Sequence, residues 1–108
     1  MSEQLGKIIS AEFGFGGYRD TQFGLSITLG GDSWSVSSFW GFWGEEPSPH
    51  AKWSKEDQVR HLGETSCRIR DLLHAAKAQH VSELVNKPIA ATFEGNVLKS
   101  WRILAEVL

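Results

Sequence analysis

The clearest structural signal in the sequence is the run Gln22-Phe23-Gly24-Leu25-Ser26-Ile27-Thr28-Leu29-Gly30-Gly31-Asp32. Up to Leu29, apolar residues alternate with small or polar ones, which is the period of two expected of a strand with one buried face. The Gly30-Gly31-Asp32 sequence that follows tolerates the positive φ angles of tight hairpin turns. The run therefore predicts a strand that ends in a hairpin.

The same period of two continues on both sides of this run. Over residues 5–15, Ile9, Ala11, Phe13 and Phe15 alternate with polar residues or glycine, and Gly16-Gly17 marks a turn or bulge. After the hairpin, tryptophan and valine alternate with serines over residues 33–37. Three sequential antiparallel strands are therefore predicted at the start of the chain.

A long helix is predicted from Ser54, a suitable N-cap with Asp57 three positions later, to about Ala78. A stripe at three- and four-residue spacing predicts the buried face: Leu62, Ser66, Ile69, Leu73 and Ala76. Cys67 is expected near this stripe as a small apolar residue. Gly63 costs roughly 1 kcal/mol relative to alanine, which a close contact between helix and sheet would explain. Another face carries a ladder typical of a solvated surface: Arg60, Glu64 and Arg68.

The C-terminal part predicts a hairpin. A short helical turn over residues 82–85 is followed by Asn86, which suits a left-handed conformation, and then by two β-rich runs around Gly95-Asn96. A two-residue turn would pair Phe93 with Leu98 and Ala90 with Trp101 on opposite faces, unless a bulge resets the register. The order β-β-β-α-β-β predicts one α+β domain over residues 1–108, with a single antiparallel sheet and one long helix across one face.

Composition and charge exclude several classes of protein. The chain of 108 residues is 41% hydrophobic and 22% charged, as expected of a globular domain. Its net charge of −2 argues against binding of duplex nucleic acid. The single cysteine excludes an internal disulfide, no apolar run is long enough to span a membrane, and the N-terminus is unlike a signal peptide. We therefore expect a cytoplasmic protein with no membrane partner.

Six aromatic residues lie within the twenty positions 34–53: Trp34, Phe39, Trp40, Phe42, Trp43 and Trp53. Glycines and prolines interrupt this segment, so residues 41–53 are predicted to form a connection that carries part of the aromatic cluster on an exposed loop. One interpretation is that the rings belong to the core. The other is that Trp40, Trp43 and Trp53 line a groove and offer stacking surface to a ligand or partner.

Tyr18-Arg19-Asp20 is the second candidate for a role in binding. An Arg–Asp pair is usually a surface salt bridge, but beside an aromatic patch Arg19 could hold a phosphate or stack on a ring. The residues predicted to bind a ligand are thus Tyr18, Arg19, Trp40, Trp43 and Trp53.

No catalytic residues, metal site or cofactor are predicted. The glycines of residues 14–17 are flanked by strands, whereas a phosphate-binding loop needs an adjoining helix. The four histidines lack zinc-ligand spacing, and no carboxylates stand out as an acid–base pair.

Three segments together resemble a group of small, uncharacterised proteins encoded by tailed phages and prophages: residues 6–18, 23–26 and 93–104. The likeness covers nearly the whole chain, although Ser35 and Asn86 stand where that group usually has glycine. The resemblance implies an accessory factor that binds a host component, and it assigns no active site.

We therefore hypothesise a non-enzymatic phage-derived binding protein that counters host defence. Its partner would be a host defence protein, masked through the aromatic-rich loop, or a small signalling nucleotide that it sequesters. The same patch could instead pair two copies of the chain into a homo-oligomer. Two alternatives remain open, a small hydrolase with an unrecognised carboxylate site and a structural or assembly protein of the virion.

Overall fold

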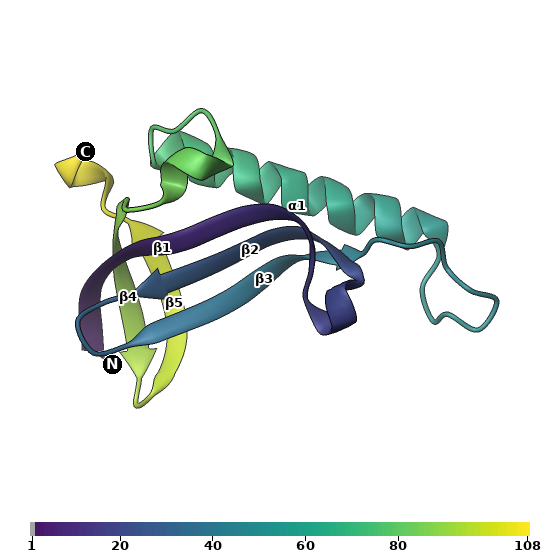
Figure 1. The fold of residues 1–108 in the computed structure, drawn as a ribbon, viewed down its shortest axis with the longest axis horizontal. Coiled ribbons are helices and arrows are strands. Elements are labelled where there is room, and N and C mark those ends of the chain that lie inside the picture. Colours follow the sequence, from purple (N-terminus) through teal and green to yellow (C-terminus); the bar gives the residue numbers. More distant parts are fainter. Residues whose placement is uncertain (1) are drawn as a thin grey trace.

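The computed structural model describes residues 2–108 and has the expected element order (Figure 1). In chain order the elements are β1 (Ser2–Gly16), β2 (Gln22–Gly30), β3 (Ser35–Trp43), helix α1 (Lys55–Ala75), β4 (Pro88–Glu94) and β5 (Val97–Ile103). Short 3-10 turns occupy Tyr18–Asp20, Val81–Leu84 and Ala105–Val107. The prediction of an α+β fold with one antiparallel sheet and one long helix is confirmed.

The five strands form one antiparallel sheet in the order β3-β2-β1-β4-β5. The central strand, β1, has different partners along its length. Residues 2–7 pair with β4, whereas residues 7–16 pair with β2, and a bulge at Ile9 separates the two parts. The strands β4 and β5 consequently run at a steep angle to β2 and β3, and the sheet is curled (Figure 1).

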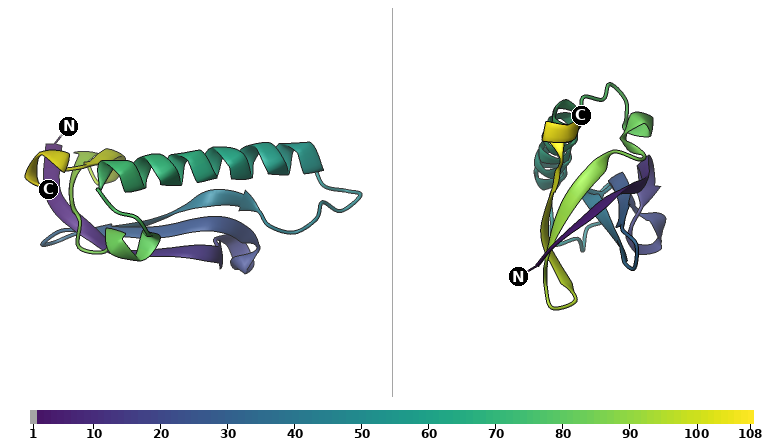
Figure 2. Two further views of the ribbon diagram at one scale, coloured as in Figure 1. Left: turned by 90° about the horizontal axis from the view of Figure 1, so that it is seen from above. Right: turned by 90° about the vertical axis from the view of Figure 1, so that its left-hand side faces the viewer.

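The core lies on the concave face of the curled sheet. Helix α1 covers this face on the side of β2 and β3, as Figure 2 shows, and the turn Val81–Leu84 covers it beside β1. The largest side chains that are almost fully removed from water are Ile8, Leu25, Ile27, Leu29, Leu84 and Ile89. Helix α1 adds Ile69 and Leu72 to them, and its C-cap adds Ala76.

The start of α1 is fixed by the predicted N-cap and by one buried amide. The Ser54 hydroxyl accepts a hydrogen bond from the Asp57 amide at 3.1 Å, and the Asp57 carboxylate accepts one from the Ser54 amide at 2.9 Å. The hydrogen bond from the Ser54 amide holds the pKa of the Asp57 carboxyl below its usual value. The Gln58 side chain, 3% exposed, donates to the carbonyl oxygens of Trp43 at 2.7 Å and Glu45 at 2.9 Å. Gln58 therefore connects the helix to the end of β3.

Four details of the predicted helix are wrong. Ser66, predicted on the buried face, is exposed. The helix ends at Ala75 with Ala76 as its C-cap, and Lys77 at φ 54° turns the chain away. Cys67 is exposed, because the buried face is centred on Gln58, Ile69 and Leu72. Gly63 is exposed as well. Apart from the neighbouring helix backbone, no atom of residues 2–108 lies within 4 Å of the position that a Cβ would take. No close contact with the sheet therefore explains this glycine.

The connection predicted over residues 41–53 begins only at Gly44, because its first three residues belong to the edge strand β3. Strand β3 continues through Phe42 and Trp43, so only Trp53 of the six aromatic residues lies in the connection that follows it. Gly41, taken from the sequence as a breaker, pairs with Gly24 inside the ladder. A Cβ at Gly41 would collide with the Phe23 carbonyl oxygen, so this glycine permits close strand packing.

Two bulges decide which side chains enter the core. In β5 the bulge at Lys99 leaves Phe93 opposite Leu98, as predicted, but places Ala91 rather than Ala90 opposite Trp101. Trp101 therefore joins the concave face. In β1 both Ile8 and Ala11 are buried, whereas Phe13 and Phe15, predicted on a half-buried face, are 51% and 61% exposed.

The backbone of Asn86 is left-handed, with φ 74°, as predicted.

No helix within residues 2–108 has both the length and the apolar character needed to cross a membrane.

We expect Gly63→Ala to raise the free energy of unfolding by about 0.5–1 kcal/mol, because alanine favours the helix and meets open space there. Urea denaturation measures this change. Gly41→Ala is the control, and it should destabilise the protein because the added methyl group meets the backbone of β2. A loss of stability in Gly63→Ala would contradict the open environment of Gly63.

Candidate functional site

The indole rings of Trp40 and Trp101 meet on the concave face, although they come from the two opposite edges of the sheet. Trp40 lies on β3 and Trp101 on β5, and the curl of the sheet brings their ring centroids to 5.9 Å with 27° between the planes. Both rings are half-buried and pack against the core. Stacked aromatic pairs of this kind are stabilising beyond the area they bury.

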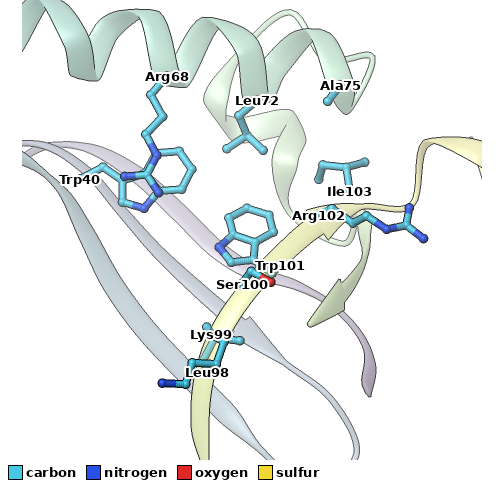
Figure 3. Close-up of a pocket in the computed structure, with 10 residues that line it drawn as sticks. All are labelled: Trp40, Arg68, Leu72, Ala75, Leu98, Lys99, Ser100, Trp101, Arg102 and Ile103. Atoms are coloured by element: carbon cyan, nitrogen blue, oxygen red, sulfur yellow. The ribbon is translucent and has the colours of Figure 1, made fainter. Parts of the chain in front are cut away.

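Arg68 of α1 adds a positive charge to the indole pair. Its guanidinium carbon lies 3.8 Å from the centroid of the Trp40 ring, in a cation–π contact that Figure 3 shows from the side of β5. None of the ion pairs formed within residues 2–108 involves Arg68. The charge of this guanidinium is therefore available to a bound anion.

A groove of about 480 Å³ opens between α1 and β5 at this point. We call it the indole groove, and the residues that line it are Trp40, Arg68, Leu72, Ala75, Leu98, Lys99, Ser100, Trp101, Arg102 and Ile103. The buried side chains of Leu72 and Ile103 give it an apolar floor. Its volume lies within the range of small-molecule sites, roughly 300–1,000 Å³.

The other two cations at the groove are partly neutralised. Arg102 extends away from the indoles in Figure 3 and binds Glu106 at 3.0 and 3.2 Å. The hydrogen bond from Arg102 holds the pKa of Glu106 below its usual value. Lys99 lies 3.8 Å from the Glu94 carboxylate, and both side chains are well exposed. Arg68 is thus the cation that this surface leaves least compensated.

The three tryptophans that were expected to form one groove lie in three environments. Trp40 lines the indole groove. Trp43, three residues further along β3, points to the opposite face because side chains alternate along a strand. Trp53 contacts Phe42 edge-on at 5.3 Å, and Phe42 in turn stacks on the His61 ring at 4.4 Å.

Tyr18, Arg19 and Trp43 form a separate cluster at the far end of β1. Tyr18 is 62% exposed and meets the Trp43 ring edge-on at 6.4 Å. The Arg19 guanidinium lies 5.3 Å from the centre of the Tyr18 ring. The structure therefore brings together three of the five residues predicted to bind a ligand, but it does not bring them to Trp40 or Trp53.

Sequence reasoning missed Arg68 and Trp101. The spacing of Arg60, Glu64 and Arg68 predicts a solvated face of the helix. The one sequence feature that places Arg68 near the core is its position one helical turn before Leu72, which is buried. A two-residue turn without a bulge predicts Trp101 on the face opposite to Phe93 and Leu98, whereas the bulge at Lys99 shifts the register and changes the face of Trp101.

Within residues 2–108, no three histidine, cysteine, aspartate or glutamate side chains converge closely enough to hold a metal ion. Comparison of the chain with protein-family models, curated proteins and solved structures found no match.

The stack between Trp40 and Trp101 should be measurable by a double-mutant cycle with Trp40→Leu and Trp101→Leu. We expect a coupling of about 0.5–1.5 kcal/mol in the free energy of unfolding, because each single change already removes the ring contact. The control is a cycle between Trp101 and Trp53, which lie near opposite ends of α1. The two changes in the free energy of unfolding should be additive within about 0.5 kcal/mol. Additivity in the first cycle would mean that the two rings do not interact.

Proposed function

We propose that the protein is a non-catalytic binding protein whose indole groove takes a small anionic aromatic ligand of the nucleotide type. The observation that carries this proposal is the guanidinium of Arg68, which lies 3.8 Å from the centroid of Trp40 and beside the second indole. Within residues 2–108 this guanidinium has no ion-pair partner. An aromatic ring needs flat stacking surface and a phosphate needs a cation, and the groove offers both within one small volume.

In this arrangement the aromatic part of the ligand lies against Trp101 and the apolar floor formed by Leu72 and Ile103. Stacking of a base on an aromatic side chain contributes about 1–3 kcal/mol. The anionic part lies toward Arg68 and Lys99. A planar guanidinium forms two parallel hydrogen bonds to a phosphate, so Arg68 would orient the ligand as well as attract it.

The resemblance to small phage proteins gives this binding activity a context. A protein that retains a signalling nucleotide without converting it would lower the concentration available to a host defence system. On this proposal the protein acts in the infected host cell as a sequestering factor. A protein that masks a host factor through its surface is the alternative, and the experiment below separates the two.

Binding is tested by calorimetry with AMP and with cyclic mono- and dinucleotides, using adenosine and ribose 5-phosphate as partial ligands. We expect at least one nucleotide to bind more tightly than either partial ligand, because only the complete molecule uses both the indoles and Arg68. Arg68→Gln should weaken its binding about tenfold to hundredfold, the loss expected for a hydrogen bond to a charged group.

Arg70→Gln is the matched control. Arg70 lies two residues further along α1, about 200° around the helix, and pairs with Asp71 at 3.0 Å. The Arg70→Gln variant should bind the nucleotide as tightly as the unmodified protein does.

Heat denaturation of the unmodified protein with its bound nucleotide distinguishes binding from catalysis. The retained ligand should be recovered intact, whereas an altered product would indicate catalysis. Failure of every nucleotide to bind would overturn the proposal and favour a protein partner.

A further inference from the structure

Among the residues that the structure describes (2–108), no strand pairs with one edge of β1 over residues 10–16. Pairing with β4 ends at Lys7, and the backbone of Ile8 still bonds Lys87 and Asn86, at 3.0 and 2.7 Å. Beyond the bulge at Ile9, β1 pairs only with β2. The last seven residues of the chain's longest strand therefore present an open sheet edge.

The hydrogen-bond pattern identifies the backbone groups that point outward from this edge. Between β2 and β3, the bonded pairs include Gly31 with Trp34 at 3.0 Å and Thr21 with Gly44 at 2.9 Å. Because bonded and non-bonded pairs alternate in an antiparallel ladder, the odd-numbered residues of β2 bond β3 and the even-numbered ones bond β1.

The register of β1 with β2 then assigns each residue of the open edge. The β1 residues that face β2 are those opposite its even-numbered positions: Ser10, Glu12, Gly14 and Gly16. The amide and carbonyl groups of Ala11, Phe13 and Phe15 point away from β2, into the open edge. Such groups are a template for a further strand.

The side chains at the open edge are apolar and carry little charge. Phe13 and Phe15 lie on the concave side next to Phe23, with ring centroids at 5.0 and 5.3 Å, yet each is more than half exposed. Glu12 is the only charged residue among positions 10–16. Proteins usually protect open edges with lysine, proline or bulges, and β5 has such protection in Lys99, Arg102 and its bulge.

We propose that the β1 edge pairs with the same edge of a second copy of the chain, antiparallel and about a twofold axis at Phe13. Phe13 is the midpoint of the unpaired residues, so this axis places every unpaired residue opposite another one. Phe13 faces Phe13 of the second copy, Ala11 faces Phe15, Glu12 faces Gly14, and Ser10 faces Gly16. The strands β3, β2 and β1 of the two copies join into one six-stranded sheet across the axis, and β4 and β5 of each copy remain attached to residues 2–7 of β1.

The pairing is complementary in hydrogen bonds, size and charge. The outward amide and carbonyl groups of Ala11, Phe13 and Phe15 all find partners, because these residues oppose one another across the axis. A large ring lies opposite a small methyl group where Phe15 meets Ala11. Neither copy of Glu12 opposes a like charge, since glycine lies across from it. A register centred on Glu12 would place two carboxylates opposite each other, which is unfavourable.

Sedimentation and amide hydrogen exchange test this proposal on the unmodified protein. We expect a mass of about 24 kDa, twice the 12.0 kDa of one chain, at high concentration. At a total protein concentration of about ten times the dimer dissociation constant, about one fifth of the chains are monomeric. The amides of Ala11, Phe13 and Phe15 should therefore exchange about fivefold more slowly than at high dilution. The amides of Glu12 and Gly14 face β2 in either state and serve as internal controls.

Charge reversal on the axis tests the register. Phe13→Lys and Phe13→Glu should each be monomeric, because each places two like charges opposite each other, and an equal mixture should form the mixed dimer. Val97→Lys is the control, since Val97 is 58% exposed on β5, far from the proposed axis. It should remain dimeric.

A protein that stays monomeric at every concentration, or a dimer that protects other amides, would overturn the proposal. So would a dimer that survives in both Phe13 variants. If the variants do not fold, the exchange pattern of the unmodified protein still decides the outcome. The edge would belong to a different partner if an unrelated strand-forming peptide had to be added before exchange slowed at Ala11, Phe13 and Phe15.

Discussion

The divided pairing of β1 is the constraint on which the rest of this structure depends. One strand serves two neighbours, β4 along residues 2–7 and β2 along residues 7–16, and a bulge at Ile9 separates the two regions. A strand shared in this way cannot keep both halves of the sheet in one plane. The sheet curls, and its two edge strands approach each other closely enough for Trp40 and Trp101 to stack. The same curl creates the concave face that α1 fills.

Both surfaces to which we assign a role follow from this arrangement. The indole groove exists because β3 and β5, four strands apart in the order of the sheet, face each other beneath α1. The open edge exists because β4 pairs with only part of β1. The two surfaces use different residues, so ligand binding and self-association can be tested independently. A common origin in one strand still means that changes near Ile9 would disturb both.

The features that the sequence predicted correctly are local. The alternation over residues 22–29, the N-cap at Ser54 and the turn at Gly95-Asn96 each depend on neighbouring residues, and each has the expected structure. The candidate groove depends instead on contacts between distant segments. No periodicity in the sequence indicates that Arg68 lies above Trp40 or that Trp40 stacks on Trp101. Gly41 misled the prediction because glycine permits close strand packing as readily as it ends a strand.

Gln58 shows how strongly the beginning of α1 depends on one chemical group. Its side-chain nitrogen satisfies two carbonyl oxygens, from Trp43 and Glu45, at a site almost closed to water. Deamidation would convert this donor into a carboxylate of nearly the same shape, which can only accept. Two carbonyl dipoles would then face a negative charge instead of an N–H group, in surroundings where water cannot replace the lost bonds. Replacement of one NH2 group by oxygen, with almost no change in size, would thus separate the helix from the strand that carries Trp40.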